Sequence, residues 1–335
     1  MLFDPAVVET VRDAVPTWLG VLLVAVTYLG SVYVIAPALI VAYWYRRAVV
    51  APWLGAVLAC YGLMSITKAY HTASRPSVGP PVGAEHFPAW FLPWYEHAAY
   101  IDTSSFPSGH ALAATVVVGV IVLDAPVSTL ARRAAVGVGV VAVVGFTRIA
   151  LGAHYPGDVL GGIAYGVAFL VVWYGLRVVA FDRRPRERLA RVGVGRPSHV
   201  TLADRVDRRR HLPGRDSLDA ATISFALALA VGTVAVTYVG SRNSHIVFGG
   251  AIGGLLAWLF APRIAAELVG TVAHYVAPVV TLTVVAGTWF VTDSGYGTEP
   301  FLVGWAALFL ATVILVPWMV STGDHFDFEH TKSTG

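Results

Sequence analysis

Three short polar motifs stand between long apolar stretches of this chain, and their residue types are those of a phosphate-handling site. They comprise Lys68 and Arg75-Pro76, then Pro107-Ser108-Gly109-His110, then Arg148, His154 and Asp158. Six residues separate the lysine and arginine of the first motif. In the third, five separate the arginine from the histidine and three separate the histidine from the aspartate. Chance agreement at so many fixed offsets is improbable.

The third motif has the composition of a nucleophile with its partner. His154 and Asp158 are four residues apart, and proline is tolerated at a helix start, so a helix beginning near Tyr155 or Pro156 brings the carboxylate to the imidazole. Asp158 then accepts one ring N–H, and the other nitrogen can attack phosphorus to form a phosphohistidine that water hydrolyses. The alternative is an interfacial histidine beside an aspartate favoured by the helix dipole.

The other two motifs predict an anion site, an acid and fixed positive charge. Ser108 is expected to cap a helix whose first amides bind phosphate, and Gly109 lets a ligand approach the backbone closely. His110 is placed to protonate the leaving oxygen. Cations stabilise a transferred phosphoryl group without a metal, and here they are Lys68, Arg75 and Arg148. Taken alone, each motif can also be explained without a functional role, as a turn, a helix cap or a side chain that anchors the helix at the membrane interface.

Composition places these motifs in a polytopic membrane protein. Of 335 residues, 56% are hydrophobic and 13% are charged, and the mean hydropathy is +0.68. Apolar runs near the roughly 20 residues that a bilayer-spanning helix needs recur along almost the whole sequence. The single cysteine, Cys60, excludes a disulfide framework or a cysteine metal cluster within one chain. Acidic residues near the N-terminus argue against a cleaved signal peptide.

The apolar runs predict an all-α transmembrane bundle of nine spans. These cover 17–44, 51–67, 108–123, 134–151, 157–180, 218–239, 245–261, 267–291 and 301–320. We expect a phosphatase core with an outer-face site over 1–181, a basic cytoplasmic loop over 182–216, and further spans with a short cytoplasmic tail over 217–335. Residues 3–14 have the pattern of a short interfacial helix.

The arginine-rich segment 182–216 sets the expected orientation. Its charge invites a nucleic-acid interpretation, but a cytoplasmic loop that obeys the positive-inside rule explains it better, so no nucleic-acid partner is expected. With Arg46-Arg47 and Arg132-Arg133 also inside, every motif falls on the outer face. Loop charge and motif position are separate features of the sequence, so their agreement supports a common site.

At these residues the chain resembles the type 2 phosphatidic acid phosphatase superfamily, whose signature is Lys-x6-Arg-Pro, Pro-Ser-Gly-His and Ser-Arg-x5-His-x3-Asp. The match covers about residues 51–180. The resemblance implies an enzyme without metal or other cofactor, in which His154 is the nucleophile, Asp158 its charge-relay partner and His110 the general acid. It assigns phosphate binding to Lys68, Arg75, Ser108, Gly109 and Arg148.

The chain departs from this family pattern in three ways. Thr147 replaces the usual serine, which keeps the hydroxyl. Two predicted spans precede the first motif, where six-span members have three. The four further spans beyond residue 217 have no counterpart in the family core, and three roles stay open for them: a longer lipid groove, a dimer face and an accessory domain.

The sequence therefore predicts a multi-pass phosphatase of the cell membrane with its site on the extracytoplasmic face. Membrane lipids surround the protein. A site at the membrane surface is accessible to amphiphilic molecules whose tails stay in the hydrocarbon. The substrate is a lipid phosphate or pyrophosphate, with polyprenyl pyrophosphate slightly favoured over a phosphatidate-like lipid. A lipid phosphotransferase with the same intermediate and an anion or lipid transporter remain alternatives. The aromatic segment 87–100 is expected to lie on the membrane beside the entry for the lipid head.

Overall fold

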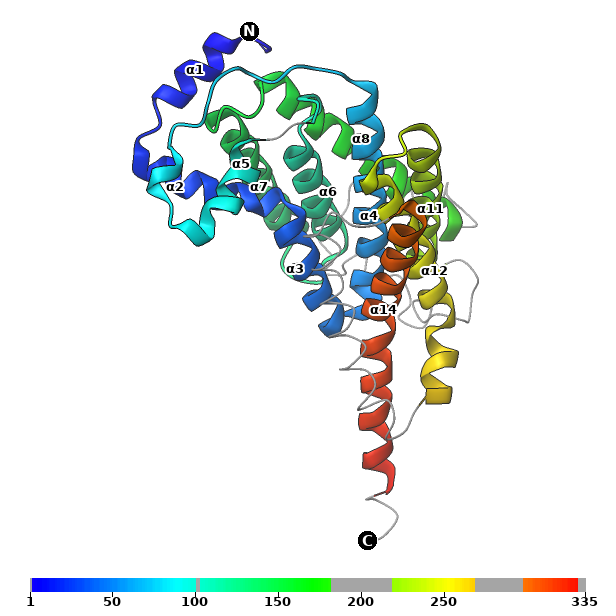
Figure 1. Cartoon of the computed structure of the whole chain (residues 1–335). Helices are drawn as coiled ribbons and strands as arrows, with labels where there is room; N and C mark the ends of the chain where they lie inside the picture. Colours follow the sequence, from blue (N-terminus) through cyan, green and yellow to red (C-terminus); the bar gives the residue numbers. More distant parts are fainter. Residues whose placement is uncertain (1, 101–102, 182–218, 269–297, 331–335) are drawn as a thin grey trace, which may run out of the picture. The chain divides into compact units, whose positions relative to one another are not determined.

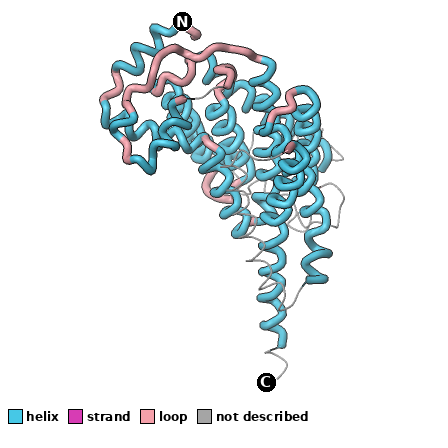
Figure 2. Tube along the Cα trace, in the orientation of Figure 1, coloured by secondary structure: helices cyan, strands magenta, loops and turns pink. Residues whose placement is uncertain are grey.

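The computed structural model describes residues 2–100, 103–181, 219–268 and 298–330, which are helical with connecting loops and contain no strand (Figures 1 and 2). The predicted all-α class is therefore confirmed for the described chain. Six of these helices are long and apolar enough to cross a membrane, as a multi-pass membrane protein requires. They are α4 (Arg47–Tyr70), α7 (Leu130–Ala150), α8 (Pro156–Phe181), α11 (Ala220–Tyr238), α12 (Arg242–Leu268) and α14 (Glu299–His330).

The predicted count of nine spans is not confirmed. The span expected over 17–44 is wrong as one helix, because the chain forms α2 (Thr17–Val26), a 3-10 turn η1 (Thr27–Gly30) and α3 (Val32–Tyr45). The short helix expected over 3–14 is present as α1 (Pro5–Asp13), and its interfacial location stays a prediction. The pair α2 and η1 is bent by 114° from it. The helix α6 (Gly109–Asp124) has only 16 residues.

Tertiary contacts explain why the first apolar stretch breaks. A Cβ atom at Gly30 would lie 2.8 Å from Val144 Cγ1 and 2.9 Å from the His110 carbonyl oxygen. The turn thus packs its backbone closely against the neighbouring helices, and glycine permits this approach. Ser31 follows in an extended conformation, and α3 starts directly after it. These tertiary contacts cannot be predicted from hydropathy.

Two segments of the expected organisation lie outside the described residues, namely the basic loop 182–216 and the span 267–291. The described chain divides into two compact units, and the division passes through α3, α4 and α8. One unit contains 2–39 and 63–175, and the other contains 40–62, 176–181, 219–268 and 298–330. Domain boundaries at residues 181 and 217 stay a prediction.

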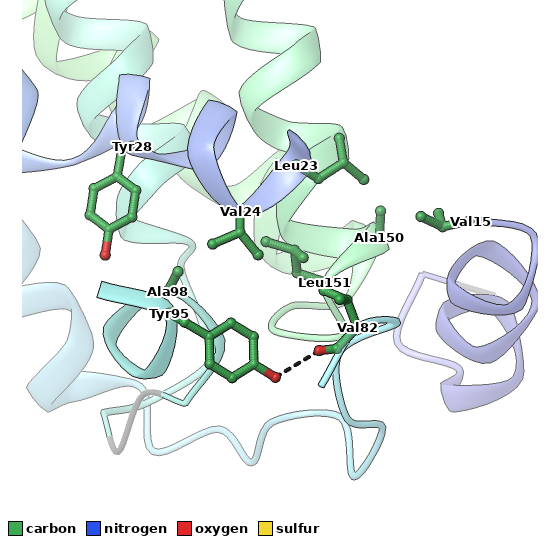
Figure 3. Close-up of a cluster of buried hydrophobic side chains, with 9 residues drawn as sticks. All are labelled: Val15, Leu23, Val24, Tyr28, Val82, Tyr95, Ala98, Ala150 and Leu151. Carbon is green, nitrogen blue, oxygen red and sulfur yellow. Dashed lines mark hydrogen bonds between the residues drawn. The ribbon is translucent and has the colours of Figure 1, made fainter. Parts of the chain in front are cut away.

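The first unit carries every predicted site residue, and a buried cluster supports them (Figure 3). The cluster comprises Val15, Leu23, Val24, Tyr28, Val82, Tyr95, Ala98, Ala150 and Leu151. It joins α2 and η1 to α5 (Leu92–Ala99) and to the end of α7. Tyr95 donates its hydroxyl hydrogen to the Val82 carbonyl at 2.7 Å, which ties α5 to the preceding loop.

The aromatic segment 87–100 contains the short helix η3 (Ala89–Phe91) and α5, and the turn η2 (Ala84–His86) precedes it. Phe87 stacks on both Phe91 and Tyr95, and all three rings pack in or against the buried cluster. Trp90 and Tyr100 are instead exposed. This division suits a segment at a membrane surface, and its location there stays a prediction.

In the second unit, glycines let α12 and α14 approach closely. A Cβ at Gly249 would lie 2.1 Å from the Val303 carbonyl oxygen, and one at Gly253 would lie 2.0 Å from that of Ala307. Small residues four apart are a usual contact between helices in membranes. Asp219 caps α11 by accepting a hydrogen bond from the Thr222 N–H, and Asp219 is buried.

Candidate active site

The turn between α7 and α8 is built to present His154. Gly152 takes φ of +70° there, and a Cβ at this position would lie 2.4 Å from the Val78 carbonyl oxygen. Both the left-handed backbone and the lack of space therefore favour glycine. The backbone N–H of His154 donates to the Arg148 carbonyl at 3.1 Å, which closes the turn.

Asp158 meets His154 as the spacing predicted, because α8 begins at Pro156 and places the aspartate in its first turn. The imidazole Nδ1 lies 3.4 Å from Asp158 Oδ2, and both side chains are about 1% exposed. The same carboxylate oxygen accepts the Tyr155 backbone N–H at 2.9 Å. These contacts fix the carboxylate beside one ring nitrogen and leave the other facing away from it.

Ser105 is a third member of this cluster that the sequence motifs do not include. Its hydroxyl donates to Asp158 Oδ2 at 2.5 Å, and its oxygen lies 3.5 Å from His154 Nδ1. The side chain is fully buried, and its backbone N–H donates to the Ala73 carbonyl at 2.9 Å. The only signal in the sequence is a hydroxyl residue two positions before Pro107, which by itself specifies nothing.

Arg75 determines which nitrogen of His154 carries hydrogen. Its Nη1 lies 3.2 Å from His154 Nε2, and a guanidinium group only donates hydrogen bonds. The Nε2 atom therefore presents a lone pair, and the ring hydrogen sits on Nδ1 beside Asp158. Burial, reinforced by the charges of Arg148, Arg75 and Lys68, holds the pKa of His154 well below its ordinary value. The imidazole is thus neutral near pH 7.

Lys68 and Arg75 converge on the backbone just before the second motif. Lys68 Nζ donates to the Ser104 carbonyl at 2.6 Å. Arg75 Nε donates to the Thr103 carbonyl at 2.9 Å, and its Nη1 also donates to the Ala153 carbonyl at 2.8 Å. Two cations from the end of α4 and the loop after it are therefore held beside the turn that carries the histidine.

Arg148 is fully buried, and residues outside the three motifs hold it. Its Nη1 donates to Thr27 Oγ1 at 2.7 Å, and its Nη2 donates to the Ala98 carbonyl at 3.1 Å. Its Nε has no hydrogen-bond partner among the described residues. Sequence reasoning predicted the arginine but neither of its partners, because η1 and α5 are distant from it in the chain.

Ser108 occupies the N-cap position of α6, but the expected side-chain cap is wrong. Its backbone is instead clamped against α8: the Ser108 N–H donates to the Asp158 carbonyl at 2.9 Å, and a Cβ at Gly162 would lie 2.5 Å from the Ser108 carbonyl oxygen. The Ser108 hydroxyl is buried and has no partner within the described residues. It is therefore available to a ligand oxygen.

Gly109 and His110 begin α6 beside the cations. A Cβ at Gly109 would lie 2.8 Å from Met64 Sδ and 3.5 Å from Lys68 Cε, so glycine lets the helix start pack against the end of α4. His110 lies within electrostatic range of His154, Arg148 and Lys68. The structure thus brings together all the site residues that the three motifs predicted, while the role of each stays a prediction.

Comparison with known proteins bears on this geometry. A sequence model of the PAP2 superfamily matches residues 49–181, which contain all three motifs. The segment that carries the site therefore matches this superfamily. Phosphatidylglycerophosphatase B of Bacillus subtilis (strain 168) is 28% identical over 184 residues, covering 50% of this chain and 80% of that protein. No solved structure matches the chain significantly.

The PAP2 match puts the site in context. It spans the predicted motifs and ends with α8, so α11, α12 and α14 lie beyond it. It also begins after η1, so Thr27 lies outside the matched segment although its hydroxyl contacts Arg148. The contacts of this site therefore extend beyond the matched segment.

Proposed function

We propose that the protein is a lipid phosphatase that hydrolyses a phosphomonoester or pyrophosphate of a membrane lipid through a phosphohistidine on His154. The observation that carries the proposal is the buried arrangement of Arg75, His154 and Asp158. The arrangement presents an unprotonated Nε2 beside a cation. The hydrogen on the other ring nitrogen, Nδ1, faces the Asp158 carboxylate. An activated histidine of this kind is a nucleophile toward phosphorus.

The first step forms the phosphohistidine. An entering phosphate accepts hydrogen bonds from Arg75 and Lys68 in place of backbone carbonyls, and its phosphorus then faces Nε2. The nitrogen forms a bond to phosphorus, the bond to the lipid oxygen breaks, and His110 gives that oxygen a proton. Asp158 stabilises the positive charge that develops on the imidazole.

The second step releases phosphate and restores the enzyme. Water attacks the phosphohistidine, His110 accepts a proton from it, and the phosphorus–nitrogen bond breaks. Fixed groups stabilise the transferred phosphoryl group in both steps, and they are Lys68, Arg75, Arg148, the hydroxyl of Ser108 and the first amides of α6. We assign the reaction to these side chains without a metal.

The proposed substrate class is a lipid phosphate on the extracytoplasmic face. The name of the Bacillus relative assigns it phosphatidylglycerophosphate, a phosphomonoester, whereas the sequence slightly favoured a polyprenyl pyrophosphate. Both present a terminal phosphate to the same cations, so the site accommodates either chemistry. The multi-pass helices support a substrate whose tail stays in hydrocarbon while its head reaches the site.

The decisive experiment measures phosphate release by the purified full-length protein. A panel of phosphatidate, phosphatidylglycerophosphate and polyprenyl pyrophosphate is supplied with a chelator present. His154→Ala is expected to abolish release and Asp158→Asn to reduce it strongly, whereas His86→Ala, at an exposed histidine of η2, retains it. Labelled phosphate should be trapped on His154 after an alkaline quench. Wild-type rates in His154→Ala would overturn the mechanism, and loss of activity with the chelator would overturn metal independence.

Two further measurements address the alternatives and the location. Products formed with and without an acceptor alcohol separate hydrolysis from phosphotransfer, and anion flux without phosphate release would favour a transporter. A Cys60→Ser background with cysteine at exposed Glu85 or Val127 tests orientation with an impermeant thiol reagent. We expect labelling from outside at position 85 but not at position 127, because the adjacent Arg132-Arg133 are predicted to lie inside.

A further inference from the structure

Arg148 is a buried cation whose hydrogen bonds are made to neutral oxygens. It is fully buried, and its guanidinium donates to the Thr27 hydroxyl and the Ala98 carbonyl. In the described part of the chain no carboxylate forms an ion pair with it. A buried charge without an opposite charge is costly, and a bound phosphate offsets that cost. The guanidinium must then be oriented by neutral groups.

Thr27 orients the guanidinium through an ordered chain of hydroxyl groups. The oxygens of Thr27 and Thr147 lie 3.1 Å apart, and Thr147 Oγ1 donates to the Val144 carbonyl at 2.7 Å. Thr147 Oγ1 is the donor in both contacts, so the Thr27 oxygen acts as an acceptor toward it. Thr27 in turn accepts from Arg148 Nη1. The Thr27 oxygen is therefore the acceptor in its contacts with both Thr147 and Arg148.

The position of Thr27 is itself determined by the break in the first apolar stretch. Thr27 begins η1, and the next residue, Tyr28, donates its hydroxyl to the Trp94 carbonyl at 2.5 Å. This bond ties η1 to α5, whose Ala98 supplies the second acceptor for Arg148. Tyr28 and Ala98 share the buried cluster of Figure 3. The two elements that hold the Arg148 guanidinium, η1 and α5, are thus packed against each other.

We propose that Thr27 is a positioning residue of the phosphate site, which holds Arg148 so that its remaining N–H groups face a phosphate beside His154. The N-terminal segment, outside the PAP2 match, thereby completes the site. Thr147 supports this position, since its hydroxyl contacts Thr27 Oγ1 as a donor at 3.1 Å. This inference rests on the proposed function for its kinetic consequences, but phosphate binding tests it independently.

The test compares variants that differ in one hydroxyl group. Thr27→Val keeps the shape and removes the acceptor, and we expect kcat/KM for the lipid phosphate to fall about tenfold, as loss of one charge-assisted hydrogen bond implies. Protection of the protein by inorganic phosphate against thermal unfolding should weaken in parallel. Thr27→Ser should keep both properties within about twofold, because the acceptor is retained. Thr115→Val, which removes a buried hydroxyl bonded to the Ala111 carbonyl of its own helix, is the matched control.

The outcomes separate the two proposals. If the wild type releases no phosphate from any lipid but Thr27→Val loses phosphate protection, the proposed function fails and the positioning role stands. If wild-type activity and phosphate protection persist in Thr27→Val, the positioning role is wrong. Should Thr27→Val fail to fold, Thr27→Ser and Thr27→Ala decide the point, since both lack the methyl group and only the first retains the hydroxyl. Equal properties in that pair contradict the proposal.

Discussion

Ser105 donates its hydroxyl hydrogen to the carboxylate of Asp158, at the oxygen that faces Nδ1 of His154. The same serine oxygen lies 3.5 Å from that ring nitrogen, so the hydroxyl lies beside both side chains where they meet. The charge on Asp158 is therefore shared between a fixed donor and the imidazole. Such a donor holds the carboxylate in place as charge develops on the ring.

Ser105→Ala should lower kcat with little change in KM. Loss of a hydrogen bond to a charged group costs about 1.5–3 kcal/mol, so we expect a decrease of about tenfold to a hundredfold. Steady-state kinetics with a lipid phosphate measure the change. Ser224→Ala is the control, because Ser224 is equally buried but its hydroxyl donates to the Ala220 carbonyl within α11. An unchanged kcat in Ser105→Ala would show that Asp158 is held without the serine.

Arg75→Gln should lower kcat/KM by about a hundredfold or more, in the range measured for loss of a group that stabilises transition-state charge. Arg75 contacts Nε2 of His154 and donates to the carbonyls of Thr103 and Ala153, so it combines charge with a fixed orientation. Arg75→Lys should recover less than a tenth of the wild-type value, because lysine keeps the charge but loses the planar fork. Full activity in the lysine variant would reduce the role of Arg75 to charge alone.

The pH dependence of the reaction should reflect the cations around His154. Burial and the charges of Arg148, Arg75 and Lys68 lower its pKa, so the neutral nucleophile persists as the solution is acidified below the ordinary range of histidine. The acidic limb of kcat/KM is therefore expected well below pH 6.5. In Arg75→Gln one cation is removed, the pKa rises, and the limb should move to higher pH. A limb that moves to lower pH would contradict this electrostatic assignment.

The chemistry of the site was predictable from local rules, whereas its support was not. The spacing of His154 and Asp158 and the proline at 156 specify a helix start that brings the two together, and α8 begins there. Position alone suggested that Ser108 caps α6, but its backbone is clamped against α8 and its hydroxyl is left without a described partner. Short-range preference was overridden by tertiary contact.

The break at Thr27 illustrates a second limit of sequence reasoning. Residues 17–44 are mostly apolar and contain no charged residue, and hydropathy treats such a run as one span. The helix ends because η1 packs against α6 and α7 and ties to α5 through Tyr28. These contacts join residues far apart in the chain, so no local pattern records them. The same contacts bring Thr27 to Arg148.

Gly152→Ala should destabilise the protein and impair catalysis together. Its backbone has φ of +70°, which costs a residue with a side chain roughly 1–2 kcal/mol, and the new Cβ would also clash with the Val78 carbonyl. The turn that carries His154 must shift to relieve that clash, so the geometry at Nε2 is lost with the stability. Thermal unfolding and kcat measure the two effects. Gly139→Ala, on α7 with open space at its Cβ, should leave both unchanged, and equal behaviour of the two variants would mean that the turn is not constrained at Gly152.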